Sequence, residues 1–309
     1  MPLETAAIAT AFFPDERLAA VVEAALKSCG QVIVVDNTPT GEESSAGVLA
    51  ELPGVSVLRS GENLGLAAAL NLGVRQLGPQ VEAVLFLDQD SVLSPELVEG
   101  LTRHLHGDPT IGIAAPAPFD MDRGKYYETR AFLHATVKDM PVVITSGMLV
   151  RREVLEKVGR FREEFFVDHV DNDFCLRARA AGFRIIRDKR LKLEHSLGTR
   201  QQHSVAGVSV TASRHPTWRL YWIARNAMVL VREHRRAEPG WAFSTMFYMC
   251  VWLGTRTVFE PPRLERAKVA LRGFSDGWRG RTSPGFLPPG ASLRTPVVAQ
   301  PDAQELNRR

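Results

Sequence analysis

Two aspartates, Asp88 and Asp90, stand one residue apart at the end of an apolar run in this 309-residue sequence. The run is Val-Leu-Phe-Leu-Asp-Gln-Asp-Ser and begins at Val84, which indicates a buried strand that opens into a polar loop. Because side chains alternate along a strand, both carboxylates leave it on the same side. A divalent cation would relieve their repulsion, and hard oxygen ligands suit Mg²⁺ or Mn²⁺ bound together with phosphates. The alternative is that one aspartate caps the helix predicted near Pro95 and the other is solvated.

Asp171 could supply a different chemistry, since it stands at the start of a predicted helix. Backbone N–H groups and the helix dipole favour an ionised carboxylate there, and such a carboxylate can accept a proton from a hydroxyl. The alternative is an ordinary helix cap. His195 follows a strand-like segment and could give a metal a nitrogen ligand, although a lone histidine at a strand end is usually a surface residue.

These acidic positions, together with Asp36, all follow predicted strands. In an open parallel sheet, ligands bind beyond the carboxyl ends of the strands, where such side chains emerge. The sequence contains neither GxGxxG nor GxxxxGK[ST], so a glycine-rich loop is not expected to hold a phosphate. A nucleotide diphosphate held by a metal on the Asp-x-Asp is the remaining economical interpretation.

Alternating strands and helices must position these side chains. Apolar runs predict strands at 6–13, 31–35, 55–58, 84–87 and 111–115, and helical periodicity predicts helices at 15–27, 66–77 and 94–104. Alternation with short connections predicts a parallel, doubly wound sheet. A long polar loop is predicted at 116–138, followed by a strand at 148–150 and a helix that ends at Ala180. This first domain is expected to span residues 1–200.

The rest of the chain is expected to be helical. Strand signals cease near residue 200, and helices are predicted at 215–234, 241–258 and 264–274 within a C-terminal region of residues 201–283. Proline, glycine and polar residues dominate from Pro284 onward, so residues 284–309 are expected to form a disordered tail.

The C-terminal region is both basic and aromatic. From Arg200 to Arg281 there are fourteen Lys and Arg against five Asp and Glu, whereas the whole chain carries only +3. The first two helices share the aromatic residues Trp218, Tyr221, Trp222, Trp241, Phe243, Phe247, Tyr248 and Trp252. The longest uncharged run, Trp241–Thr255, is shorter than the roughly 20 apolar residues of a spanning helix.

An aromatic and basic face on a segment that does not span is what attachment to an anionic membrane surface requires. The alternative is that these aromatics fill a helical core or a homodimer interface. No motif of a nucleic-acid reader accompanies the arginines, so nucleic-acid binding is not expected.

Taken in order, the motifs resemble those of the family 2 inverting glycosyltransferases. The set is Asp36-Asn37, Asn63-Leu64-Gly65 with Asn71 and Gly73, Phe-Leu-Asp-Gln-Asp-Ser, Thr-Ser-Gly, Val-Asp-x-Asp-Phe-Cys-Leu-Arg and Glu-His-Ser-Leu-Gly. Within that family the sequence is most similar to bacterial rhamnosyltransferases that use dTDP-L-rhamnose, which share Asp-Gln-Asp-Ser and the segment Leu271–Arg281. The resemblance covers about residues 6–282, and the motifs are specific as an ordered set.

The resemblance implies a GT-A fold, a Rossmann-like and mostly parallel α/β sheet, here with a C-terminal helical appendage. It implies that Asp171 is the general base and that Asp90 and His195 bind Mg²⁺ or Mn²⁺. Val170 replaces the acidic first residue of the family's base motif, so Asp168 and Asp173 remain alternatives to Asp171. Nucleotide-sugar binding is implied for Phe13, Asp36, Asn37, Asn63, Gly65, Asn71 and Asp88, and acceptor binding for Ser146, Gly147, Asp173, Arg225 and Asn226.

The implied reaction transfers a sugar, L-rhamnose from dTDP-L-rhamnose or a sugar from another nucleotide, to a saccharide acceptor linked to polyprenyl diphosphate. It would serve the synthesis of a cell-surface or cell-wall polysaccharide. The enzyme is expected in the cytoplasm, peripheral at the inner face of the membrane. The N-terminus has no features of a signal peptide, and Cys29, Cys175 and Cys250 are placed as reduced thiols rather than as disulfides.

Two other classes compete with this interpretation. Phe-Leu-Asp-Gln-Asp-Ser also fits the start of a haloacid-dehalogenase-like phosphatase, but that motif normally lies on the first strand, and here a βαβαβ unit is predicted before it. A non-catalytic subunit could instead use the basic aromatic C-terminal region to assemble at a membrane. Release of phosphate from small phosphoesters would favour the first, and failure to bind any nucleotide sugar would favour the second.

Overall fold

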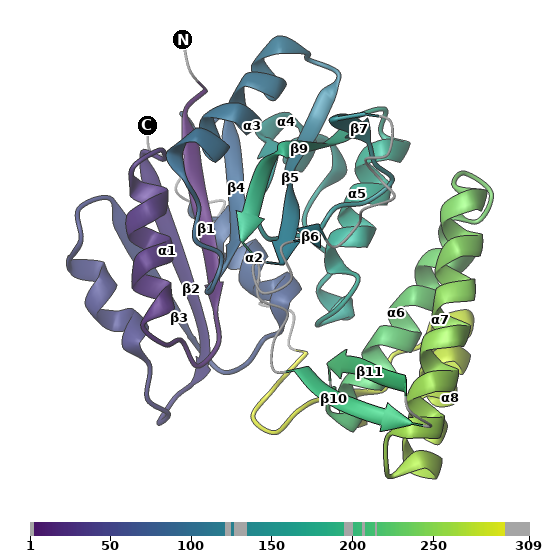
Figure 1. Ribbon diagram of the computed structural model, residues 1–309. Helices are drawn as coiled ribbons and strands as arrows, with labels where there is room; N and C mark the ends of the chain where they lie inside the picture. The colour runs from purple at the N-terminus through teal and green to yellow at the C-terminus, as the bar shows by residue number, and fades with distance from the viewer. Residues whose placement is uncertain are drawn as a thin grey trace, which may run out of the picture.

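The computed structural model describes residues 3–120, 125–126, 135–194, 200–205, 208–213 and 215–293. Its main body has three layers, in which helices cover both faces of a central sheet (Figure 1). Further helices from the C-terminal part of the chain stand beside this body (Figure 1). The α/β architecture with a helical appendage is therefore as the sequence predicts.

The central sheet has nine strands within the described residues. They are β1 (Thr5–Ala11), β2 (Gln31–Pro39), β3 (Val55–Gly61), β4 (Ala83–Asp88), β5 (Ile111–Asp120), β6 (Lys125–Tyr126), β7 (Val137–Asp139), β8 (Met148–Arg151) and β9 (Arg184–Glu194). Their order is β3-β2-β1-β4-β8-β5-β9-β7, and β6 pairs with β5. The pairs among β1–β4 and the pair β5–β9 are parallel, whereas β8 is antiparallel to both neighbours. The carboxyl ends of β1, β2 and β4 thus lie together at one edge.

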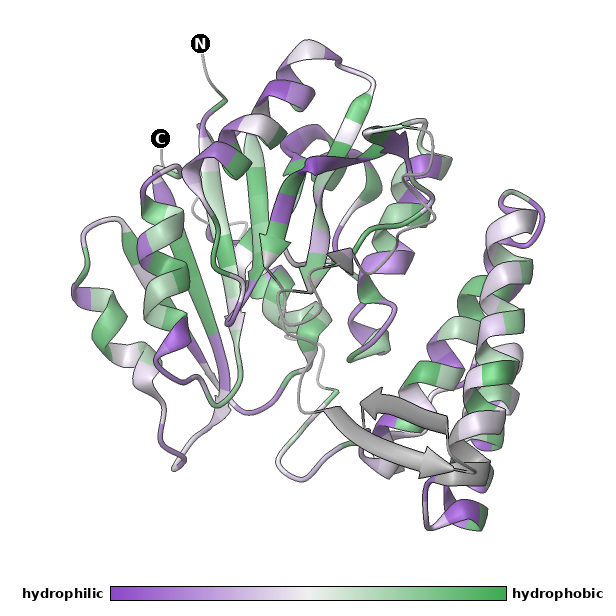
Figure 2. Ribbon diagram, viewed as in Figure 1, coloured by the Kyte–Doolittle hydropathy of each residue, from purple (hydrophilic) through white to green (hydrophobic). Residues whose placement is uncertain are grey.

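Two apolar layers hold the helices to the sheet. The helices α1 (Arg17–Leu26) and α3 (Pro95–Gly107), with the 3₁₀ turn η1 (Ser45–Glu51), pack on one face. The helices α2 (Leu66–Val74), α4 (Arg152–Val158) and α5 (Val170–Ala180) pack on the other. Along β4, Val84 and Phe86 enter one layer while Leu85 and Leu87 enter the other, as the period of two requires. Figure 2 shows these strands as the apolar centre of the body.

Two segments differ from the sequence prediction. In the expected loop 116–138, β5 continues to Asp120 because, after a shift of register at Pro116/Ala117, it goes on pairing with β9. Beyond residue 200, where no strands were expected, β10 (Arg200–Val205) and β11 (Val208–Ser213) form an antiparallel hairpin. Both pairings depend on partners that local periodicity does not reveal.

The C-terminal helices are α6 (Thr217–His234), α7 (Pro239–Phe259) and α8 (Arg263–Arg279). The pair α6–α8 packs closely because Gly273 has no side chain: a Cβ there would lie 2.5 Å from the carbonyl oxygen of Tyr221. None of the helices in the described ranges has the length and apolar character needed to cross a bilayer.

Residues 284–293, expected to belong to a disordered tail, are ordered and form what we call the C-terminal strap. The strap begins with the 3₁₀ turn η4 (Pro284–Phe286), whose Phe286 ring stacks on Tyr221 at 4.3 Å between centroids. It then reaches the main body, where the Asn63 N–H donates to Gly290 O (3.3 Å) and Ser292 N–H donates to Asn63 O (3.0 Å). The strap stays in place because its apolar side chains pack around Trp222. Residues 294–309 lie outside the described residues.

Candidate active site

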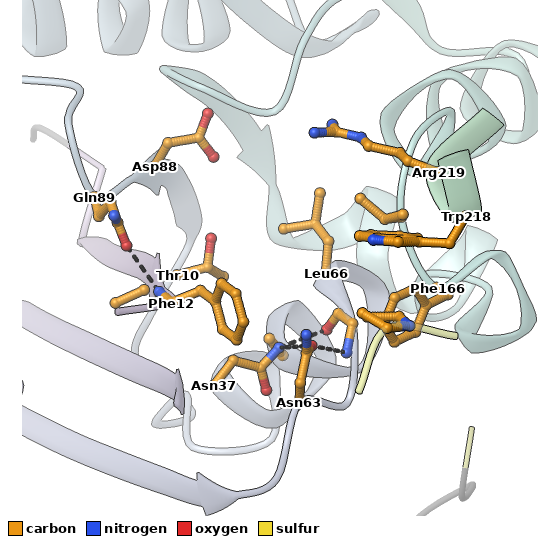
Figure 3. A pocket seen from close by; sticks show the side chains of 15 residues that line it. Thr10, Phe12, Asn37, Asn63, Leu66, Asp88, Gln89, Phe166, Trp218 and Arg219 are labelled. Carbon is orange, nitrogen blue, oxygen red and sulfur yellow. Dashed lines mark hydrogen bonds between the residues drawn. The ribbon is translucent and has the colours of Figure 1, made fainter. Parts of the chain in front are cut away.

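A cavity of about 420 Å³ opens at the carboxyl ends of β1, β2 and β4 (Figure 3). Its lining comes from the main body, from α6 and from the strap: Thr10, Ala11, Phe12, Asn37, Asn63, Gly65, Leu66, Ala69, Asp88, Gln89, Phe166, Val167, Trp218, Arg219 and Pro288. Figure 3 shows Asp88 and Gln89 on one side of it and Trp218 and Arg219 on the opposite side. This is the edge at which a parallel sheet binds its ligand.

One wall of the cavity is a turn held by two buried asparagines. The Asn37 amide donates to Gly65 O (3.0 Å), and its oxygen accepts from Leu64 N–H (3.3 Å). The Asn63 side chain accepts from Gly65 N–H (3.0 Å). Gly65 has φ +81°, and a Cβ on it would lie 2.6 Å from the carbonyl oxygen of Phe166. Glycine is needed at this position because the backbone at Phe166 approaches so closely.

The side of the cavity that carries Asp88 and Gln89 is formed where β1 and β4 end. The Phe12 N–H donates to Gln89 Oε1 (2.7 Å), and the Phe13 N–H donates to Thr38 Oγ1 (2.9 Å). Phe12 lines the cavity, whereas the neighbouring Phe13 ring is exposed and contacts Phe12 edge to face. Gln89, the residue between the two aspartates, therefore joins the end of β1 to the end of β4. The sequence analysis did not single it out.

Asp88 ends β4 and lines the cavity. Burial, and then the negative charge of Asp90, raise the pKa of the Asp88 carboxyl to about 6. Asp90 is more open and faces Arg17, with 3.7 Å between Oδ2 and Nη1. A divalent cation between the two carboxylates would offset the effect of the Asp90 charge on Asp88, and Mg²⁺-type sites complete such a pair with substrate phosphates.

The described residues contain no cluster of three or more His, Cys, Asp and Glu that could hold a metal. The two carboxylates still fit a cation that takes its remaining ligands from water and a diphosphate. His195, the expected nitrogen ligand, lies outside the described residues.

Asp171 is the second residue of α5 and is partly buried. The N–H of Asn172 donates to its Oδ1 (2.8 Å). Burial raises the pKa of the Asp171 carboxyl to about 6, with smaller upward contributions from the charges of Asp168 and Asp88. Asp171 is not among the described residues that line the cavity, although the charge of Asp88, which does line it, acts on the Asp171 carboxyl.

Asp168 and Asp173, the alternatives to Asp171, both have cationic partners. Asp168 forms a two-point ion pair with Arg219, at 2.8 and 2.9 Å. Asp173 is fully buried and pairs with Arg177 (2.7 Å) and Arg162 (3.3 Å). Within the described chain, Asp171 is the carboxylate of the three that has no ion pair.

Two cavity residues lie on α6: Trp218, one of the aromatics that the sequence predicts on a membrane-facing surface or in a helical core, and Arg219. Arg219 is the single cationic side chain among the described residues that line the cavity. Trp218 lies next to Phe166, with 6.3 Å between ring centroids. The available sequence signal was a Trp-Arg pair at the start of a predicted helix, but only the fold turns that end of the helix toward the sheet edge.

Of the residues expected to bind the nucleotide sugar, the cavity lining contains Asn37, Asn63, Gly65 and Asp88 and does not contain Phe13, Asp36 and Asn71. Asp36 is buried and accepts from Thr38 N–H (3.0 Å), with Arg59 at 3.5 Å. Asn71 is buried and holds the backbone of Phe161 at both its N–H and its carbonyl. These side chains shape the main body rather than the cavity surface.

The residues expected at the acceptor are also outside the cavity lining. Ser146 is buried against Ser91, and the N–H of Gly147 donates to Phe86 O (2.8 Å). Arg225 and Asn226 are buried in α6, and their side chains bond to backbone groups of other segments. Asp173, as described above, is enclosed by two arginines. Each of these polar groups is already satisfied within the fold.

Comparison with known proteins identifies the family of this chain. The sequence model described as "Glycosyl transferase family 2" matches residues 10–159. The dTDP-rhamnosyl transferase RfbF of Shigella flexneri is 32% identical over 216 residues, which are 66% of this chain and 71% of that protein. The chain belongs to glycosyltransferase family 2.

Solved structures show the same GT-A fold at low sequence identity. The mannosyltransferase PcManGT of Pyrobaculum calidifontis, in complex with GDP-Man and Mn²⁺, has a TM-score of 0.59 at 15% identity over 92% of this chain and 79% of that one. GalNAc-T7 with UDP, GalNAc and Mn²⁺ has a TM-score of 0.54 at 13% identity over 74% of this chain. The chain spans about half of GalNAc-T7, 48% of its length.

Proposed function

We propose that this glycosyltransferase moves L-rhamnose from dTDP-L-rhamnose to a saccharide acceptor with inversion at the anomeric carbon. The observation that carries the proposal is the cavity at the strand ends, which Asp88 lines. Asp171, on whose pKa the charge of Asp88 acts, has no ion pair in the described chain. The 32% identity to a dTDP-rhamnosyl transferase supports the choice of donor.

In this mechanism Asp171 is the general base. With a pKa of about 6 the carboxylate is ionised at neutral pH, yet it is basic enough to accept a proton from the attacking hydroxyl. The acceptor oxygen bonds to the anomeric carbon as the bond from that carbon to the diphosphate oxygen breaks. The proton passes to Asp171, and attack on the face opposite the diphosphate inverts the configuration.

Negative charge develops on the departing diphosphate and needs a counter-charge. Arg219 faces the cavity and can donate to phosphate oxygens, which a guanidinium binds with two parallel hydrogen bonds. Asp90, with Asp88, would hold Mg²⁺ or Mn²⁺ there, and the bound metal would neutralise part of the diphosphate charge.

A donor screen tests the proposed reaction. The protein is incubated with dTDP-L-rhamnose, UDP-sugars and GDP-mannose, each with Mg²⁺ or Mn²⁺, and the released nucleotide diphosphate is measured. We expect the highest release from dTDP-L-rhamnose, with reversible loss in EDTA and loss in Asp90→Asn. Full activity in EDTA would contradict a metal role. Release of phosphate from small phosphoesters without sugar-nucleotide turnover would support the phosphatase alternative.

We propose further that the acceptor is lipid-linked and that α7 rests on the inner membrane surface, which would place the enzyme in cell-surface polysaccharide synthesis. Phe243, Phe247 and Val251 recur every four residues on α7, and they are 76%, 64% and 50% exposed. The adjoining α8 adds exposed apolar and basic side chains: Leu264, Lys268, Leu271, Arg272, Trp278 and Arg279. An apolar row with basic neighbours matches the interface of an anionic leaflet.

Sedimentation with liposomes tests this attachment. We expect the protein to sediment with anionic but not neutral vesicles, and less so as salt is raised. Phe243→Ser combined with Phe247→Ser should abolish it, while the matched control Val48→Ser, at an exposed apolar residue of η1, should not. Equal recovery in the supernatant with both lipids contradicts membrane attachment. A dimeric mass in solution that the double variant converts to a monomer would assign α7 to a homodimer interface instead.

A further inference from the structure

The segment directly before Asp171 has an unusual backbone. Phe166, Asp168 and His169 have φ values of 55°, 60° and 61°, which place three non-glycine residues in the left-handed region. That conformation is costly for residues with a Cβ, and it persists only where surrounding contacts hold it. We call residues 165–169 the base loop. Contacts from other segments must hold its backbone in this conformation for α5 to begin where it does.

Asn226 of α6 supplies that support. Its side chain is completely buried, and its Nδ2 donates to the carbonyl oxygens of Phe165 (2.8 Å), Val167 (2.9 Å) and Asp168 (2.9 Å). Its Oδ1 accepts from Arg225 Nη1 (2.9 Å), which fixes the orientation of the amide. A single side chain from the helical appendage thus gathers three carbonyls of the base loop.

The opposite side of the base loop is held by the cavity wall. The N–H of Leu66 donates to Phe166 O (2.6 Å), beside the close approach at Gly65. Downstream, α5 starts on the loop, since Asp173 N–H donates to His169 O (2.9 Å). Asp171 lies between these two attachments, so a displacement of the loop carbonyls displaces its carboxylate.

We propose that Asn226 is a positioning residue, which acts through the base loop to hold the Asp171 carboxylate in its place at the start of α5. The proposal rests on the proposed function of Asp171, and it departs from the acceptor contact that the resemblance implied for Asn226. It also gives α6 a role in the reaction that none of the comparisons assigns.

The test begins with a measurement that needs no activity. In Asn226→Asp, a carboxylate of the same shape removes the two N–H donors that the three carbonyls share, and Asn226→Ser keeps one hydroxyl donor if the first variant folds poorly. Hydrogen exchange of the backbone amides at 165–175 should become faster in the full-length variant.

The matched control is Tyr221→Phe on the same helix, which loses buried bonds to Asp276 (3.0 Å) and Ser283 N–H (2.8 Å), neither of which belongs to the base loop. Unchanged exchange in the base loop, or equal acceleration in both variants, would overturn the proposal.

Kinetics then separate positioning from a general loss of structure. We expect Asn226→Asp to lower kcat about 100-fold with the Kd for dTDP within threefold of the parent, whereas Tyr221→Phe should leave kcat within threefold. The double variant Asp171→Asn with Asn226→Asp should have nearly the same kcat as Asp171→Asn alone, because the carboxylate that Asn226 positions is already absent. Additive losses, or a parallel loss of dTDP binding, would overturn it. The unmodified protein could prove inactive while Asn226→Asp still speeds hydrogen exchange in the base loop. That result would count against the proposed function and would support the link between Asn226 and the base loop.

Discussion

The helices α6 and α7 are alike in composition and opposite in position. Both are rich in aromatic residues, but Tyr221 and Trp222 of α6 are completely buried, whereas Phe243 and Phe247 of α7 are largely exposed. The α6 aromatics have partners for their polar atoms: Trp222 Nε1 donates to Phe286 O (2.9 Å) and Tyr221 Oη donates to Asp276 (3.0 Å). Burial of a large aromatic residue is favourable when its polar end is satisfied. Composition alone could not tell a core helix from a surface helix.

Two arginines on α6 also differ in position, one at the cavity and one in the core. Arg219 turns to the cavity and pairs with Asp168. Arg225 is buried and bonds to Arg281 O (3.1 Å), Glu164 O (3.3 Å) and Thr282 Oγ1 (2.7 Å). Arg219 thus lines the cavity while its charge is paired with Asp168, whereas Arg225 ties separate segments together. Variants on the two helices can therefore separate α6, which we propose supports the reaction, from α7, which we propose rests on a membrane.

The largest effect should follow from removing the carboxylate that α6 supports. Asp171→Asn should lower kcat by about 10²–10⁴-fold with donor affinity nearly intact, because a general base acts in the transition state. Steady-state kinetics and calorimetry with dTDP measure the two quantities. The same kinetics on Phe247→Ala of α7 should match the parent. If Asp171→Asn is active while Asp168→Asn is dead, the base is Asp168.

The next largest effect is expected in the free energy of unfolding, which should differ between a variant of α6 and a variant of α7. Trp222→Ala should lower the free energy of unfolding by about 3–5 kcal/mol, because it empties a fully enclosed site and leaves the Phe286 carbonyl without its donor. Phe247→Ala should change it by no more than about 0.5 kcal/mol, since the ring is already exposed. Urea unfolding of both variants gives the comparison. Similar losses at the two positions would show that α7 is covered in solution.

Acidification should reduce turnover through Asp171. Because the pKa of this carboxyl is raised to about 6, log kcat should fall with unit slope below that pH as the base becomes protonated. The raised value also means that the folded state binds this proton more tightly than the unfolded chain, so ionisation at higher pH destabilises the fold. Asp171→Asn should therefore melt a few degrees higher than the parent at pH 8. The difference should vanish below the ordinary pKa of 3.8, and a constant difference at all pH values would exclude this cause.

The smallest effect is expected for the cavity cation. Arg219→Gln should weaken dTDP binding about 10-fold and leave thymidine binding unchanged, because in the proposed mechanism the guanidinium binds the diphosphate and not the nucleoside. Calorimetry with both ligands measures this. Arg236→Gln, which removes an exposed arginine just beyond α6, should change neither affinity. Equal weakening of dTDP and thymidine would show that Arg219 supports the shape of the cavity instead.

The sequence by itself determined the parallel core and the acidic edge of the sheet. Strand and helix periodicities are local, so β1, β2 and β4 could be predicted, together with the placement of Asp88 where β4 ends. The order of motifs along the chain was enough to indicate the family. Boundaries were less certain where pairing is non-local, as in β5 and in the hairpin β10–β11.

Only the tertiary structure decided which polar side chains are free for a ligand. Asp36, Asn71, Asp173 and Asn226 have the residue types of a binding site, yet each is buried and bonded within the fold. The reason is that buried backbone groups and cations need partners as much as a ligand does, and the same amides and carboxylates satisfy both. Sequence shows that such a group is present, but its partner comes from a distant segment, as Asn226 does for the base loop. That distant pairing is decided by the packed structure.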